Sequence, residues 1–185
     1  MLRIKQLLTL PAALAAVILM MASCGMARYE CSDPLGCLQV SRNGQVVIGA
    51  ILATSGEQRS LGTSSLINVK QAVTDKDNLF GHSFQLFTYA TDCTAGSAHE
   101  AATEFAINPD MAAVIGPTCI DEVGAASQIL LNAGIPILGP VITSTDASAL
   151  TKKMLDALQK VTVRMPDGTL YIPRQALLSA LNISR

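Results

Sequence analysis

Cysteine and histidine are the side chains of this sequence with the most distinctive chemistry. The chain has 5 cysteines and 2 histidines, His82 and His99. No two cysteines have the C-x-x-C spacing of a zinc site, so we predict no metal site. No histidine is spaced to activate a cysteine nucleophile, and the G-x-S-x-G, P-loop and G-x-G-x-x-G motifs do not occur. We therefore predict no catalytic residue and no cofactor, and a small α/β enzyme is the least favoured class.

The first of the cysteines, Cys24, lies at the end of a segment with the pattern of a targeting signal. Arg3 and Lys5 precede an apolar stretch over residues 7–20, and Met-Ala-Ser-Cys-Gly follows at 21–25. This order predicts a secretory signal peptide over residues 1–23. The cysteine after Ala-Ser resembles a bacterial lipobox, in which the thiol receives a lipid. We expect an exported protein, lipid-anchored to the bacterial cell envelope; the alternatives are an ordinary signal peptide with Cys24 incidental and a retained anchor.

The remaining four cysteines are an even number in a compartment that favours disulfides. Four cysteines allow three pairings. Cys31 and Cys37 bracket a short loop, whereas Cys93 and Cys119 each follow a predicted strand and could meet at one edge of a sheet. We favour the pairs Cys31–Cys37 and Cys93–Cys119, and the other two pairings stay open.

Strands and helices that alternate along the chain are needed to position these groups. Apolar runs predict strands at 46–53, 83–90, 112–116 and 135–139, and apolar periodicity predicts helices at 64–74, 98–107 and 118–132. We expect the last of these helices to begin with a capping box of Thr118 and Asp121. The alternation predicts an α/β fold, an open parallel sheet with helices on both faces. A C-terminal helical piece follows, with helices at 150–163 and after Pro173 around an extended stretch.

Composition and charge exclude some classes of partner. The chain has 185 residues, a net charge of -1, no tryptophan and 4% aromatic residues. Binding to nucleic acid requires a basic surface and stacking aromatic side chains, so we expect no nucleic-acid partner. Charge changes along the chain: residues 77–151 contain no lysine or arginine, whereas most of the charged residues in 152–185 are basic.

Residues 46–149 resemble the first lobe of the branched-chain amino acid type of extracellular solute-binding proteins, the type I periplasmic binding proteins of ABC transporters. The matching stretches are Ile-Gly-Ala at 48–50, Thr-Ser-Gly at 54–56, Leu-Gly at 61–62, Asp-Cys at 92–93, residues 113–119 and residues 134–140. The pair Cys93–Cys119 fits the disulfide of that family. The lipobox and the Cys-x5-Cys leader are also similar to bacterial members.

Residues 154–185 resemble the end of the same family, whose members have two lobes. We therefore predict four parts: a signal peptide (1–23), a lipid-anchored leader (24–45), the first lobe (46–149) and a C-terminal segment (150–185). Between the first lobe and the C-terminal segment, the stretch that would carry most of the second lobe is absent. The resemblance implies a substrate-binding lipoprotein of an ABC importer for branched-chain amino acids or related amides or acids, in incomplete form. The alternative is an exported remnant lobe without transport activity.

The resemblance also implies where a ligand would bind. Val141, through its backbone, and Thr143 would meet the α-carboxylate and α-amine of an amino acid, and Ser55 would lie in the first loop. Cys119 and Ile120 complete the candidate ligand-binding residues, although Ile120 replaces a hydroxyl that the amino acid binders carry. The implied partners are a small-molecule ligand, an ABC permease and the membrane, through the lipid on Cys24.

Several of these residues also have purely structural interpretations. Ser55 and Thr143 are residue types that close turns or cap helices. For Asp121 we favour a helix-capping role over ligand contact, and we expect His82 and His99 to be exposed.

Overall fold

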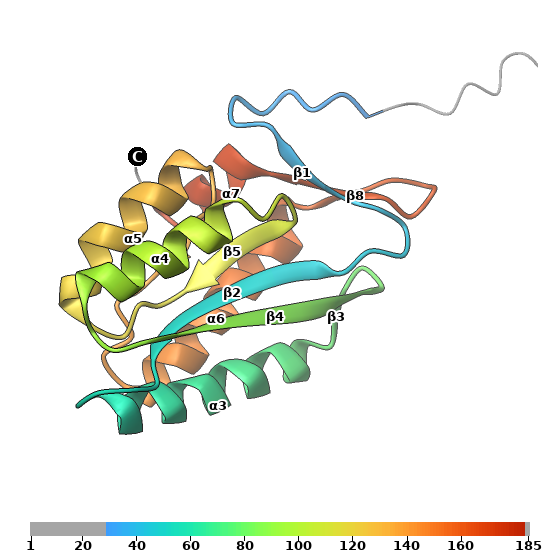
Figure 1. Cartoon of the computed structure of the whole chain (residues 1–185). Helices are drawn as coiled ribbons and strands as arrows, with labels where there is room; N and C mark the ends of the chain where they lie inside the picture. Colours follow the sequence, from blue (N-terminus) through green and yellow to red (C-terminus); the bar gives the residue numbers. More distant parts are fainter. Residues whose placement is uncertain (1–28, 184–185) are drawn as a thin grey trace, which may run out of the picture. The chain divides into compact units, whose positions relative to one another are not determined.

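The computed structural model describes residues 29–183, and its central feature is a five-stranded sheet in the order β3-β4-β2-β5-β6. Strands β4, β2, β5 and β6 run parallel, and the short β3 pairs antiparallel with β4 (Figure 1). The strand bounds are β2 (Val46–Ala53), β3 (Asn78–Leu79), β4 (His82–Thr91), β5 (Met111–Ile115) and β6 (Ile137–Leu138).

The central strand β2 shows why the sequence folds in layers. All eight of its residues are buried, because they are apolar or glycine. Alternate side chains point to opposite faces of a strand. Ile48 and Leu52 accordingly join one core cluster with Met154, while Ile51 joins a second cluster with Phe105.

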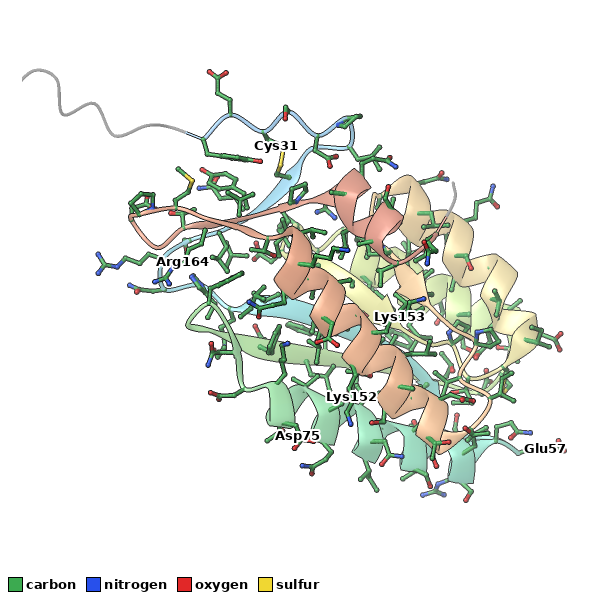
Figure 2. All side chains as sticks on the ribbon, turned by 180° about the vertical axis from the view of Figure 1, so that it is seen from behind. Cys31, Glu57, Asp75, Lys152, Lys153 and Arg164 are labelled. Carbon is green, nitrogen blue, oxygen red and sulfur yellow. A yellow bond between two sulfur atoms is a disulfide. The ribbon has the colours of Figure 1, made fainter. Side chains whose placement is uncertain are left out.

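Helices cover both faces of this sheet. Helices α3 (Arg59–Lys76) and α6 (Ser144–Val161) pack together on one face, and α4 (Ala95–Ala106) and α5 (Ile120–Asn132) pack together on the other (Figure 1). Figure 2 shows α6 beside α3, with Lys152 and Asp75 labelled on the two helices. Lys76 and Asp156 join the same two helices by a salt bridge of 3.1 Å.

A second, three-stranded antiparallel sheet has the order β1-β8-β7. Its strands are β1 (Cys37–Val40), β7 (Val163–Arg164) and β8 (Leu170–Pro173), and α7 (Arg174–Ala180) follows directly. Because β1 pairs with β8, part of the predicted leader lies beside the predicted C-terminal segment. The residues from Cys31 onward form one compact unit.

The main strands and helices predicted from the sequence are confirmed, with small differences in their ends. The α/β class and the mostly parallel sheet are confirmed as well. Strands β1, β3 and β7 were not predicted. Helix α6 begins at Ser144, six residues before the predicted start at 150, because Thr143 caps it by accepting a hydrogen bond from the Asp146 N–H.

Two local predictions are wrong. The capping box at the start of α5 consists of Cys119 and Glu122, one residue after the predicted pair. The hydroxyl of Thr118 is used elsewhere, since it accepts a hydrogen bond from the Ala53 N–H at 3.0 Å. His82 is buried, with 5% of its surface exposed, because its ring nitrogens meet two backbone carbonyl groups.

The signal peptide and Cys24 lie outside the described residues. Within residues 29–183, no helix is both long enough and apolar enough to cross a bilayer.

Candidate functional site

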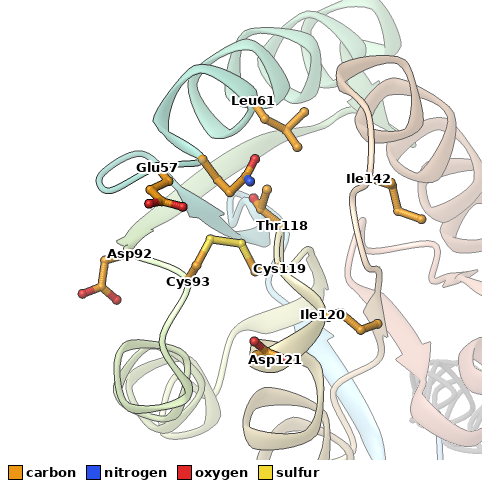
Figure 3. Close-up of a pocket in the computed structure, with 10 residues that line it drawn as sticks. Glu57, Leu61, Asp92, Cys93, Thr118, Cys119, Ile120, Asp121 and Ile142 are labelled. Atoms are coloured by element: carbon orange, nitrogen blue, oxygen red, sulfur yellow. A yellow bond between two sulfur atoms is a disulfide. The ribbon is translucent and has the colours of Figure 1, made fainter.

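A cavity of about 520 Å³ opens where β2, β4 and β5 end. In an open parallel sheet, loops at the carboxyl ends of the strands form the usual ligand site. The lining comes from the loop after β2, the first turn of α3, the loop after β4, the segment that leads from β5 into the start of α5, and the segment before α6 (Figure 3). The lining residues are Glu57, Gln58, Leu61, Asp92, Cys93, Thr118, Cys119, Ile120, Asp121 and Ile142.

The chain reaches this edge through close backbone approaches. Gly116 follows β5 with a φ of 110°, and a Cβ atom there would lie 2.1 Å from the carbonyl oxygen of Ile51 in β2. Only glycine fits such an approach. This close approach of the two strands lets the Thr118 hydroxyl accept a hydrogen bond from the Ala53 N–H, which holds the start of α5 against the end of β2.

Ser55 connects the loop after β2 to the end of β4. Its backbone N–H and its hydroxyl both donate to the carbonyl oxygen of Thr91, at 3.2 and 2.9 Å. The hydroxyl therefore holds two loops of the site together.

Asp92 is a rigidly held carboxylate at the mouth of the cavity. Its Oδ1 accepts hydrogen bonds from the hydroxyls of Thr94 and Ser97, each at 2.7 Å, and from the Thr94 N–H at 3.2 Å. These bonds stabilise the ionised form, so the hydroxyls of Thr94 and Ser97 lower the pKa of Asp92. Asp92 therefore carries its negative charge at neutral pH.

The lining is acidic and apolar. It contains the carboxylates of Glu57, Asp92 and Asp121, and no lysine or arginine is among the described lining residues. Ile120 and Ile142 are 71% and 70% exposed. The cavity therefore offers negative charge and accessible apolar surface.

Helix α5 adds a partial positive charge to this surface. Its first residues, Ile120 and Asp121, line the cavity. The N–H groups of a first helical turn have no partner within the helix and attract anions. Asp121 also lies in this turn, but the capping partner of Cys119 is Glu122, whose carboxylate accepts from the Cys119 N–H at 3.2 Å.

Both favoured disulfides are confirmed. Cys93 bonds to Cys119 across the inner side of the cavity, joining the loop after β4 to the start of α5 (Figure 3). Cys31 bonds to Cys37, the first residue of β1, and neither residue lines the cavity.

The structure brings two of the five predicted ligand-binding residues to the cavity, Cys119 and Ile120. Ser55 holds the neighbouring loop. Val141 is fully buried, and its N–H donates to the Pro117 carbonyl at 2.8 Å. Thr143 caps α6. Ser55, Val141 and Thr143 are not among the lining residues, and their roles in binding stay predictions.

Several lining residues were not among the predicted ligand-binding residues. Glu57, Gln58 and Ile142 lie one to three residues from Ser55 or Val141, and Asp92, noted above only as part of the resemblance, lies two residues after the predicted strand 83–90. The charge pattern was the available signal, because residues 77–151 carry acidic groups without lysine or arginine.

A family model for the receptor family ligand binding region matches residues 66–169 of the chain. A search of curated proteins found no match. Among solved structures, a Rhodospirillum rubrum protein assigned as a branched-chain amino acid ABC transporter is 14% identical, with a TM-score of 0.50. That match covers 75% of this chain and 46% of the other, and it supports the α/β fold described above.

Two further structures are similar over a shorter part. A leucine-binding protein of Thermotoga maritima is 22% identical over 50% of this chain and 26% of its own, with a TM-score of 0.47. A branched-chain amino acid transporter substrate-binding protein of Streptococcus pneumoniae, in complex with isoleucine, is 21% identical over 50% of this chain and 28% of its own, with a TM-score of 0.48. The chain thus spans less than a third of the length of these two proteins.

Proposed function

The chain belongs to the receptor ligand-binding-region family, and from this premise we propose that its compact unit is one lobe of a solute-binding protein. The proposed ligand is a small amino acid, or a related amide or acid, bound in the cavity at the ends of β2, β4 and β5. The proposed role is binding without chemical conversion of the ligand.

The observation that carries this proposal is the arrangement of charge in the cavity. The N-terminal turn of α5 suits a carboxylate, because its free N–H groups and the helix dipole attract an anion. The carboxylates of Glu57, Asp92 and Asp121 suit an ammonium group. Exposed Ile120 and Ile142 offer contact to an aliphatic side chain. A zwitterionic amino acid with an apolar side chain matches all three features.

Affinity for such a ligand is expected to be low when this lobe acts by itself. Small-molecule sites usually bury most of the ligand surface. A complete site of micromolar affinity corresponds to about -8 kcal/mol, and half of that free energy corresponds to a dissociation constant near 1 mM. We therefore expect no saturable binding of leucine, isoleucine or valine below about 100 μM.

Nuclear magnetic resonance titration of the full chain tests the proposal. Leucine at millimolar concentration should shift the backbone amides of Cys119, Ile120 and Asp121. Asp121→Lys should weaken binding several-fold, because it places a cation where the ammonium group would lie. Glu104→Lys, on an exposed part of α4, makes the same change of charge away from the cavity and should have little effect.

The two contrary results have different meanings. If leucine, isoleucine, valine and related amides all leave these amides unshifted, the binding proposal is wrong and the alternative of a remnant lobe gains support. One-to-one micromolar binding by calorimetry would contradict the low affinity and indicate that a further part of the protein, or a second copy, completes the site.

As part of this proposal, the partner would be an ABC permease that receives the ligand from a complete two-lobed receptor. The lipobox at Cys24 supports a tether to the outer side of a bacterial membrane, close to such a permease.

A further inference from the structure

Three side chains with metal-binding atoms converge beside the cavity. The Sγ atoms of Cys93 and Cys119 and a carboxylate oxygen of Glu122 all lie within 4.8 Å of one another. In the oxidised protein the two sulfur atoms are bonded to each other, so they cannot act as thiolate ligands.

Glu122 is unusual among these groups because it is completely buried. One of its oxygens accepts a hydrogen bond from the Cys119 N–H at 3.2 Å. The other, Oε1, has no hydrogen-bond partner among the described residues. Buried polar atoms in native proteins nearly always have a partner, so an unpaired carboxylate oxygen needs an explanation. Capping of α5 explains only one of the two oxygens.

We propose that, once the disulfide is reduced, Cys93, Cys119 and Glu122 form a binding site for one thiophilic divalent cation such as Zn²⁺. This site shares Cys93 and Cys119 with the lining of the cavity, but the proposed amino acid binding does not require the cation.

The site forms in two steps, reduction of the disulfide and binding of the cation. A dithiol reductant supplies two electrons and two protons, the S–S bond breaks to give two thiols, and the reductant becomes a disulfide. The cation then displaces both thiol protons to solvent and binds two thiolates and one carboxylate. Two positive charges thus meet three negative ones, and water can supply a fourth ligand.

The geometry and surroundings suit such a site. Tetrahedral zinc with bonds of about 2.3 Å to sulfur places its two sulfur ligands about 3.8 Å apart, so breaking the S–S bond requires only a small separation within the present cluster. Cys119 caps the N-terminus of α5, which favours a thiolate. The Cys119 N–H orients the Glu122 carboxylate, as outer-shell groups do in natural metal sites. Both cysteines line the cavity, which supplies a path for entry.

Cobalt binding to the full chain tests this inference. A background of Cys24→Ser, Cys31→Ser and Cys37→Ser leaves only the relevant pair of cysteines. After reduction with a dithiol and its anaerobic removal, titration with Co²⁺ should give sulfur-to-cobalt charge-transfer absorption that saturates at one ion per chain. Zn²⁺ should abolish this absorption by displacement. The oxidised protein should show none of it.

Variants of two adjacent carboxylates identify the third ligand. Glu122→Gln preserves size and can still accept from the Cys119 N–H, but it should weaken Co²⁺ binding at least about tenfold, since even outer-shell changes cost 10–100-fold. Asp121→Asn, which neutralises the exposed carboxylate of the preceding residue, should leave the Co²⁺ affinity unchanged. Circular dichroism of the oxidised Glu122→Gln protein checks that the fold is retained.

Three results would overturn the inference. They are the absence of thiolate absorption in the reduced parent protein, unchanged affinity in Glu122→Gln, and equal Co²⁺ binding before and after reduction. The last result would assign the binding to the carboxylates at the mouth of the cavity.

Discussion

His82 is a buried polar residue that connects three segments of the chain. It begins β4, and its Nδ1 lies 2.9 Å from the carbonyl oxygen of Gly44, before β2. Its Nε2 lies 2.8 Å from the carbonyl oxygen of Gly168, in the turn between β7 and β8. The ring nitrogen that carries the hydrogen donates it to the carbonyl oxygen that it faces. His82 thus links the large sheet to the small one.

Replacing His82 should therefore lower stability far more than replacing the other histidine. His82→Ala removes a buried ring and the hydrogen bond that it donates to a half-buried carbonyl group, which costs about 1–3 kcal/mol. His99→Ala, on the exposed face of α4, should change the free energy of unfolding by less than about 0.5 kcal/mol. Urea denaturation of both variants measures the difference. Equal values would show that the two contacts of His82 contribute nothing to stability.

Among the elements, α3 and α5 each contain a glycine, and the two glycines have opposite surroundings. A Cβ atom on Gly62 of α3 would lie 1.9 Å from the carbonyl oxygen of Ala53 in β2. A Cβ atom on Gly124 of α5 would have nothing within 4 Å outside its own helix. Gly62 therefore sets how closely α3 approaches the sheet, and this approach positions Leu61 in the cavity.

The same substitution should have opposite effects at these two positions. Gly62→Ala should destabilise the protein by about 1–3 kcal/mol, because the backbone of α3 or β2 must move to make room. Gly124→Ala should stabilise it by about 0.5–1 kcal/mol, because alanine loses less conformational freedom on forming a helix. Denaturant titrations give both values. A Gly62→Ala protein at least as stable as the parent would show that the close approach of α3 to β2 does not require glycine.

For the molecule as a whole, the location of the compact unit depends on the N-terminal segment. A disulfide joins Cys31 to Cys37, the first residue of β1, and β1 pairs with β8. The chain is therefore fixed to the compact unit from Cys31 onward. Disulfides persist in oxidising compartments outside the cytoplasm. The two disulfides therefore support the proposal of export, and the lipobox supports a tether at Cys24.

Cys24→Ala should abolish lipid attachment if this proposal is correct. Metabolic labelling with a fatty acid in a bacterial host should mark the parent chain and not the variant, and unprocessed precursor should accumulate. The double variant Cys31→Ser, Cys37→Ser should keep the label, because those cysteines form a disulfide instead. Normal processing of Cys24→Ala would contradict the lipoprotein assignment and favour an ordinary signal peptide.

Much of the α/β architecture follows from the sequence by itself, because the signals for it are local. The apolar run of β2 predicts a buried strand, and the alternation of such runs with helical periodicity predicts a parallel sheet. The position of Cys93 and Cys119 after strands was enough to favour their pairing, since parallel strands end at one edge. Cys119 and Ile120 were named as ligand-binding residues from the resemblance, and both line the cavity.

Only the tertiary structure decided how individual polar groups are used. Thr118 has the residue type of a helix cap, but its hydroxyl accepts a hydrogen bond from the Ala53 N–H of a distant strand. Cys119 and Glu122 cap α5 instead. The pairing of β1 with β8 and the burial of His82 likewise depend on segments far apart in sequence. Periodicity is a property of neighbouring residues, whereas the partner of a hydrogen-bonding group is chosen among all the groups that the fold brings within reach.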